Sequence, residues 1–152
     1  MSCDLFSLKE SDACLLGWND DLKTCSNEAN TFLIDGGCYM FVDQRKPFND
    51  AKNYCESKRG RLFEPRSVRT NKLVAEKGYE VLNNQNMWFG IISKNGISGP
   101  WKFATSGENV VQTIWAFNQP NNVNEGCGYY SHGEKWWDYS CTDSYKFICE
   151  FV

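Results

Sequence analysis

Between residues 47 and 78 the apolar positions recur at the spacing of amphipathic helices. Pro47 suits the first turn of a helix, and Gly60 is expected to end that helix. The apolar side chains that share one face of it are Phe48, Ala51 and Cys55. Ser67 is the expected N-cap of a second helix, and Gly78 is its expected C-cap.

Short aromatic and β-branched runs, separated by turn residues, occupy much of the remaining chain. They predict strands at residues 38–42, 88–92, 101–103, 128–130 and 147–151. Residues 1–37 are polar and predict only short hairpin or loop elements. Because helices precede most of the strands and do not alternate with them, the expected class is α+β.

The length and charge of the chain exclude several kinds of protein. A chain of 152 residues is the usual size of one domain. The net charge is −3 and no run of five like charges occurs, so nucleic acid is not an expected partner. No apolar run approaches the roughly 20 residues that span a bilayer, so no membrane span is expected.

The cysteines indicate the compartment. The chain has eight cysteines, one histidine and no Cys-x-x-Cys pair, which favours four disulfides over zinc ligation. Disulfides persist in oxidising compartments, so a secreted, extracellular protein is expected. No apolar signal segment follows Met1, and we expect the signal to have been removed from the mature chain.

The segment from Gln119 to Glu150 combines oxygen-bearing side chains with glycines, aromatic residues and three cysteines, without helical periodicity. Its two amides and two carboxylates are hard oxygen donors, which suit Ca²⁺ better than zinc or copper. The alternative is that these amides and carboxylates are ordinary turn formers.

Residues 25–152 resemble the C-type lectin-like domain family. The motifs that carry the resemblance are Cys38-Tyr-x-Phe, the helical Cys55, Trp88-Phe89-Gly90-Ile91, Gln119-Pro120-Asn121, Trp136-x-Asp138-x-x-Cys141 and Phe147-Ile148-Cys149-Glu150. The resemblance implies two helices packed on short antiparallel sheets, a long irregular ligand-binding loop region and stapling by disulfides. It divides the chain into an N-terminal Cys-containing extension, residues 1–24, and a carbohydrate-recognition domain, residues 25–152.

The resemblance also implies the disulfide pairing. The family pairs are Cys55 with Cys149 and Cys127 with Cys141, and its long form adds Cys25 with Cys38. Cys3 and Cys14 remain, and pairing with each other is the preferred prediction. One or both could instead bridge two chains into a homodimer. In a further alternative, Cys14 to Cys25 forms the family's N-terminal hairpin.

By position, the resemblance implies one Ca²⁺ site. The expected ligands are Gln119, Asn121, Glu125 and Asp138, with a cis peptide before Pro120. The family's fifth ligand is an Asn, and Trp137 stands there without an oxygen to offer. Weak binding, in the range of about 10⁻⁴ to 10⁻³ M, is therefore expected. A second ion is not expected, because Lys94 and Ser98 occupy its approximate ligand positions.

In such a site two sugar hydroxyls would complete the coordination shell of the ion. The same hydroxyls would form hydrogen bonds with the side chains that hold the ion. The expected sugar-binding residues are Gln119, Asn121, Glu125, Trp137 and Asp138. The Gln-Pro-Asn sequence matches neither the mannose-type nor the galactose-type motif of the family, so it does not predict specificity. Trp137 either packs into the domain or stacks on the sugar. His132 is expected to be uninvolved.

The expected function is that of a secreted, Ca²⁺-dependent lectin that recognises glycans, such as those on microbial surfaces in innate immunity. The alternative is a member of the same fold that binds a protein or another non-sugar surface without calcium. Catalysis is not expected, because carboxylates committed to an ion are poor proton donors and no nucleophile accompanies Glu125 and Asp138.

Overall fold

The structure is a computed structural model that describes residues 18–19, 24–25 and 28–152. The N-terminal elements are β1 (Trp18–Asn19) and β2 (Thr24–Cys25), which pair antiparallel. The remaining elements in chain order are β3 (Thr31–Ile34), β4 (Gly37–Pro47), α1 (Phe48–Ser57), β5 (Arg61–Leu62), α2 (Val68–Val81), β6 (Met87–Ser93), the 3-10 turn η1 (Gly96–Ser98), β7 (Lys102–Phe103), β8 (Gly126–Tyr130), β9 (Trp136–Ser140) and β10 (Ser144–Phe151). None of the helices in the described residues is long and apolar enough to cross a membrane.

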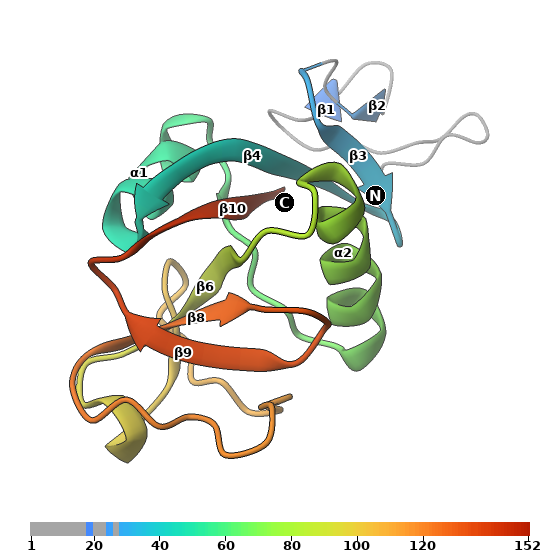
Figure 1. The fold of residues 1–152 in the computed structure, drawn as a ribbon. Helices are drawn as coiled ribbons and strands as arrows, with labels where there is room; N and C mark the ends of the chain where they lie inside the picture. Colours follow the sequence, from blue (N-terminus) through green and yellow to red (C-terminus); the bar gives the residue numbers. More distant parts are fainter. Residues whose placement is uncertain (1–17, 20–23, 26–27) are drawn as a thin grey trace.

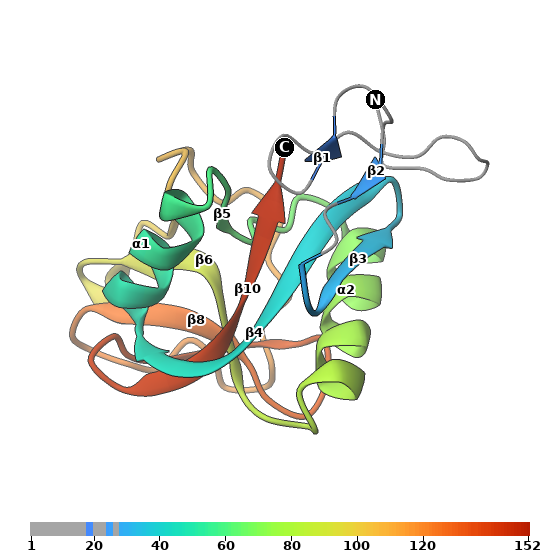
Figure 2. The same cartoon turned by 90° about the horizontal axis from the view of Figure 1, so that it is seen from above.

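One sheet organises the domain, with the strand order β3-β4-β10-β6-β8-β9. Its pairs are antiparallel except that β10 and β6 run parallel. Strand β5 pairs with β10, and β7 pairs with β6. The two helices lie on opposite sides of β4 and β10, as Figures 1 and 2 show. The α+β class and the C-type lectin-like arrangement are confirmed.

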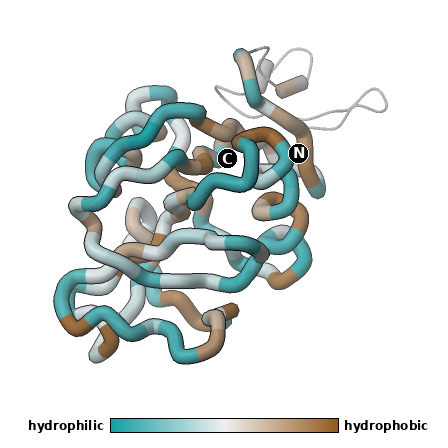
Figure 3. Tube along the Cα trace, viewed as in Figure 1, coloured by the Kyte–Doolittle hydropathy of each residue, from teal (hydrophilic) through white to brown (hydrophobic). Residues whose placement is uncertain are grey.

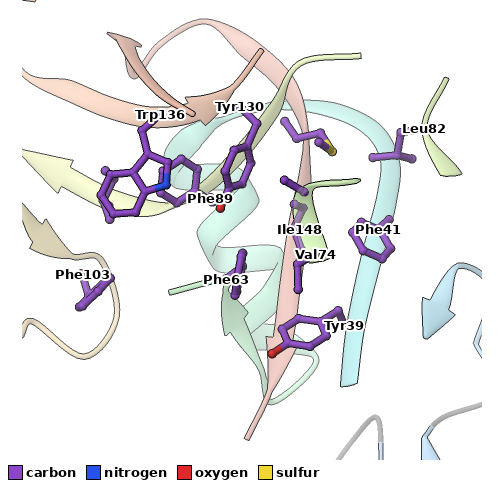
Figure 4. Packing of buried hydrophobic residues seen from close by; sticks show 13 residues of the cluster. Tyr39, Phe41, Phe63, Val74, Leu82, Phe89, Phe103, Tyr130, Trp136 and Ile148 are labelled. Atoms are coloured by element: carbon purple, nitrogen blue, oxygen red, sulfur yellow. The ribbon is translucent and has the colours of Figure 1, made fainter. Parts of the chain in front are cut away.

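Side-chain alternation buries both faces of the central strands. On β4, Met40 and Val42 face α1, whereas Tyr39 and Phe41 belong to the cluster on the α2 side. On β10, Phe147 packs with the first cluster. Figure 4 shows the second cluster, in which Ile148 and Val74 lie between aromatic rings. The long irregular segment between β7 and β8 is thereby attached to a sheet that has a core on each face.

The first predicted helix is present with slightly different ends: Pro47 is its N-cap, just before the first turn, and it ends at Ser57, before the predicted stop at Gly60. For the second helix, the Ser67 hydroxyl accepts a hydrogen bond from the Thr70 amide, as expected of an N-cap. The prediction that Gly78 is its C-cap is wrong, because α2 continues to Val81. A Cβ at Gly78 would lie 2.5 Å from the Met87 sulfur, so the glycine provides packing space within the helix.

The predicted strands are found within β4, β6, β7, β8 and β10, although β7 is limited to Lys102–Phe103. Strands β3, β5 and β9 were not predicted. Strand β9 matters for the loop region because it carries Trp136, Trp137 and Asp138.

Three of the expected disulfides are present, namely Cys25–Cys38, Cys55–Cys149 and Cys127–Cys141. The alternative in which Cys14 is disulfide-bonded to Cys25 is wrong, because Cys25 is bonded to Cys38, although β1 and β2 do form a hairpin between these positions. The expected Cys3–Cys14 pair lies outside the described residues.

Asn71 connects α2 to the β8–β9 hairpin. It is fully buried, and its Oδ1 accepts hydrogen bonds from the Tyr130 hydroxyl and from Trp136 Nε1. Its Nδ2 donates to the Glu134 carbonyl at 2.9 Å. Burial raises the pKa of Tyr130, so this phenol stays a hydrogen-bond donor. One amide therefore satisfies three polar groups at the junction of helix and hairpin.

The variant Asn71→Leu is expected to lower the free energy of unfolding by about 2–4 kcal/mol, because it leaves the Tyr130 hydroxyl and the Trp136 N–H buried without an acceptor. Urea denaturation followed by tryptophan fluorescence measures the loss. The matched control is Asn53→Leu on the exposed side of α1, where a change within about 0.5 kcal/mol is expected. Equal losses in both variants would contradict this role.

Candidate functional site

Residues 104–125, all of them described by the structure, contain neither helix nor strand, and the later part of this segment lies with η1 at the lower end of the molecule in Figure 1. Backbone hydrogen bonds attach this segment to β9. The Trp136 amide donates to the Ile114 carbonyl, and the Ala116 amide donates to the Trp136 carbonyl. The Trp115 ring lies between those of Trp101 and Trp136, at centroid distances of 4.9 and 5.6 Å. The irregular segment therefore has a defined path.

Asp138 lies at the centre of the predicted site. Its Oδ1 accepts a hydrogen bond from the Asn121 amide at 2.9 Å, and its Oδ2 accepts one from the Asn122 amide at 3.0 Å. The Asp138 amide is 3.5 Å from Gln119 Oε1, and the Gln119–Pro120 peptide is cis. Only 3% of Asp138 is exposed. This carboxylate thus holds the Gln119-Pro120-Asn121 segment against β9.

Asn122 is a site residue that sequence reasoning missed. Its amide reaches Asp138, its Nδ2 donates to the Glu125 carbonyl, and its own carbonyl accepts from the Ile97 amide. Gly96, with φ +55°, permits this contact, since a Cβ there would lie 2.1 Å from the Asn122 oxygen. The only sequence signals were a second Asn beside Asn121 and a glycine at a turn.

Glu125 lies apart from these contacts. Its side chain is exposed, and its carboxylate makes no hydrogen bond or ion pair with the described residues. It lines a pocket of about 410 Å³ beside the start of α1, together with Phe48, Lys52 and Ile92. The structure therefore joins Gln119, Asn121 and Asp138 through hydrogen bonds but shows no such contact for Glu125.

Trp137 and Asp138 project to opposite faces of β9, because successive strand residues alternate. In the ladder with β8, Trp137 is opposite Tyr129 and Asp138 is opposite Gly128. Trp137 is half-buried, so it is neither a core anchor nor fully open to solvent. Burial raises the pKa of Tyr129, and the negative charge of Asp138 adds to this shift.

The remaining sequence candidates lie at the edges of the site. Lys94 and Ser98 are exposed on either side of Gly96. His132 is exposed in the turn between β8 and β9, at the end of the hairpin away from residues 126 and 140, and its Nδ1 is 2.9 Å from the Ser131 hydroxyl.

The oxygen atoms beside Asp138 are of the type that a hard cation prefers, although the described residues contain no cluster of three or more His, Cys, Asp or Glu side chains that could hold a metal. Each Asp138 oxygen accepts one N–H, and a carboxylate has about four lone-pair positions, so each oxygen keeps capacity for an ion. The side chain of Asn121 is exposed and makes no hydrogen bond with the described residues. If bound, Ca²⁺ would be held by the side-chain oxygens of Gln119, Asn121, Glu125 and Asp138, and it would supply a coordination point for ligand hydroxyls.

Comparison with known proteins places this geometry in a family. The model of the lectin C-type domain matches residues 44–151. The C-type lectin lectoxin-Lio1 of Erythrolamprus poecilogyrus is 31% identical over 144 residues, covering 90% of this chain and 79% of that protein.

Solved structures agree with this match. The carbohydrate-recognition domain of the mouse scavenger receptor C-type lectin superposes with a TM-score of 0.71 at 25% identity, covering 80% of this chain and 93% of that domain. A calcium-independent type II antifreeze protein shares the fold, with a TM-score of 0.68 at 20% identity over 82% of this chain and 93% of that one. This chain belongs to the C-type lectin domain family.

Proposed function

We propose that this domain binds glycans through one Ca²⁺ ion, held by Gln119, Asn121, Glu125 and Asp138. The observation that carries the proposal is the attachment of the loop to Asp138 by two backbone hydrogen bonds, from the amides of Asn121 and Asn122. These bonds fix the backbone of the segment beside Asp138 before any ion arrives, which lowers the ordering cost of binding. The domain-family match and the carbohydrate-recognition domain among its structural neighbours support the same interpretation.

The affinity for the ion is expected to be weak. The protein offers roughly five oxygens against the six to eight that Ca²⁺ prefers, since Trp137 supplies none. The carboxylates of Glu125 and Asp138 alone bring negative charge. Waters and sugar hydroxyls complete the shell. The type of sugar, mannose-like or galactose-like, is not assigned.

A column test distinguishes this mechanism from its alternatives. The domain is expected to be retained on immobilised mannose- or galactose-terminated glycans in millimolar Ca²⁺ and to elute with EDTA. Isothermal titration with Ca²⁺ is expected to give a dissociation constant of about 10⁻⁴ to 10⁻³ M. Retention that survives EDTA would refute the calcium mechanism.

A second candidate function is calcium-independent binding of a protein or another non-sugar surface. The observation that favours it is that both Asp138 oxygens already accept N–H groups in a buried setting, so the loop holds its shape without an ion. Exposed apolar side chains on the loop region, Phe117 at 88% and Val123 at 73%, would suit such a surface. Figure 3 shows apolar segments at this end of the molecule. Absence of retention on every glycan column would favour this candidate.

We further propose that the protein is secreted and that it acts by binding and not by catalysis. In this proposal residues 25–152 form the recognition domain, and residues 1–24 are its N-terminal extension. Three disulfides support an oxidising compartment. Recognition of microbial glycans in innate immunity would be assisted by a homodimer linked through Cys3 or Cys14, since two sites per particle raise avidity. A non-reducing gel that shows only monomer would exclude the covalent dimer.

A further inference from the structure

A polar pocket lies at the end of the sheet where β4 finishes and where β6 and β10 begin. Its volume is about 340 Å³. The residues that line it come from three separate stretches of the chain and are Arg45, Asn84, Gln85, Asn86, Ser144 and Tyr145. We call it the amide pocket, after the three side-chain amides in its wall. None of its residues is a proposed Ca²⁺ ligand.

The register of the central strands brings these stretches together. On β10, Tyr145 pairs with the residue that follows Arg45 on β4. The residue after Tyr145 pairs with Met87, which directly follows Asn86. Strand β10 lies between β4 and β6, so Arg45 and Asn86 reach the amide pocket from the two sides of Tyr145.

Two of the polar side chains in the amide pocket are already held in place. The Arg45 guanidinium donates a hydrogen bond to Gln85 Oε1, and Gln85 Nε2 donates to the Asn83 carbonyl at 3.3 Å. Arg45 forms no ion pair with the described residues, so its other N–H groups are free to bind a ligand. The side chains of Asn84 and Ser144 are exposed and form no hydrogen bond within that part of the chain. The pocket therefore combines oriented polar groups with unsatisfied ones.

Turn formation explains only part of this run of amides. Asn83 and Asn84 have φ of +58°, the left-handed conformation that asparagine tolerates. Gln85 and Asn86 do not have positive φ, so the turn does not require amides at these two positions. Burial raises the pKa of Tyr145, while a hydrogen bond with the Asn86 side chain acts in the opposite direction. The Tyr145 phenol therefore stays protonated and can donate to a ligand.

Aromatic rings continue from the amide pocket along the side of the sheet opposite Asp138. The ring centroids of Tyr145 and Tyr129 are 4.9 Å apart, and Trp137 is the ladder partner of Tyr129. All three side chains are partly exposed. Each presents a large apolar surface together with one polar atom. A ligand in the pocket thus has an apolar wall beside its polar contacts.

The mixture of polar groups indicates the class of ligand. A bound anion needs donors and a bound cation needs acceptors, whereas a sugar hydroxyl both donates and accepts. The guanidinium of Arg45 supplies donors, and the amides and the Ser144 hydroxyl supply both donors and acceptors. Concave sites that combine a few convergent polar groups with aromatic side chains bind small molecules.

We propose that the amide pocket is a second saccharide site, which binds a neutral pyranose without calcium. It goes beyond the proposed function and does not depend on it. The pocket is small and partly open to water, so a dissociation constant of about 10⁻³ M is expected. Binding of this strength does not hold a protein on a washed column, and elution by EDTA remains the test of the ion site.

Nuclear magnetic resonance in excess EDTA tests the pocket while the ion site is empty. The probes are the methyl glycosides of glucose, mannose, galactose and N-acetylglucosamine, each titrated to about 20 mM. At least one of them is expected to shift the side-chain NH₂ signals of Asn84 and Asn86 in a saturable way. The same signals report on the variants, because neither residue is replaced in them.

The variant Arg45→Ala/Gln85→Ala removes the held pair and is expected to weaken binding about tenfold. The matched control is Arg69→Ala/Gln112→Ala, which removes the same two residue types at exposed positions on α2 and in the irregular segment. This control is expected to bind as the unaltered protein does. Matching melting temperatures show that both variants are folded.

Three outcomes would overturn the amide pocket as a saccharide site. The first is that no glycoside shifts the two amide signals, and the second is that Arg45→Ala/Gln85→Ala binds as tightly as the control. The third is that sodium sulfate shifts these signals at lower concentration than any glycoside, which would identify an anion site instead. Because EDTA is present throughout, none of these results bears on the proposed ion site.

Discussion

The variant Asp138→Asn is expected to abolish retention on glycan columns and to loosen the loop that carries Gln119 and Asn121. The substitution keeps one oxygen but places an NH₂ donor against one of the two amides that now bond to the carboxylate. Only 3% of Asp138 is exposed, so two hydrogen-bond donors that face each other here are expected to lower the free energy of unfolding by about 1–3 kcal/mol. The loss of one negative charge removes the ion-binding capacity that remains.

Hydrogen exchange at the amides of Asn121 and Asn122 measures the loosening directly, and exchange is expected to accelerate. Glu125→Gln is the matched control. Its side chain makes no hydrogen bond with the described residues, so it should weaken Ca²⁺ binding while leaving exchange at both amides unchanged. Slow exchange in Asp138→Asn would show that the loop does not depend on this carboxylate.

The double variant Cys55→Ala/Cys149→Ala is expected to lose more stability than any of the other variants, about 4–5 kcal/mol. The bridge joins α1 to β10 across a sequence separation of 94, so its removal frees a long loop in the unfolded chain. Both cysteines are fully buried, and alanine avoids introducing buried hydroxyl groups.

Guanidinium denaturation of the two disulfide variants tests this expectation. Cys127→Ala/Cys141→Ala opens a bridge with a sequence separation of only 14 and is expected to cost about 3 kcal/mol. The loss of this short bridge should affect mainly β8, β9 and the irregular segment before them. A larger loss from the short bridge than from the long one would contradict the loop-entropy explanation.

The regular parts of the fold were predictable from local signals. Ser67 is the N-cap of α2 as expected, because a capping hydroxyl acts within one turn, and Pro47 precedes α1 by one position as its N-cap. The prediction for Gly78 was wrong because a glycine can either end a helix or leave space for a packed side chain. The side chain here is that of Met87, nine residues along the chain.

Of the predicted site residues, the structure joins three through hydrogen bonds, whereas Glu125 makes no such contact and Asn122 was not predicted. Gln119, Asn121 and Asp138 come together, yet β9 was missed because two adjacent tryptophans and an aspartate do not alternate in polarity as a half-buried strand does. Without β9, the opposite projection of Trp137 and Asp138 could not be seen. The part played by Asn122 depends on backbone amides, which carry no sequence signal.

The way Asp138 holds the loop through backbone amides also has an evolutionary and engineering consequence. Since the path of residues 114–122 is fixed by main-chain groups, exposed side chains such as Phe117 can change without altering that path. Tolerance of substitution at loop tips on a fixed frame is the property that makes a scaffold useful for selecting new binders. A library randomised at positions 111, 117 and 123 would sample new surfaces at little cost in folding.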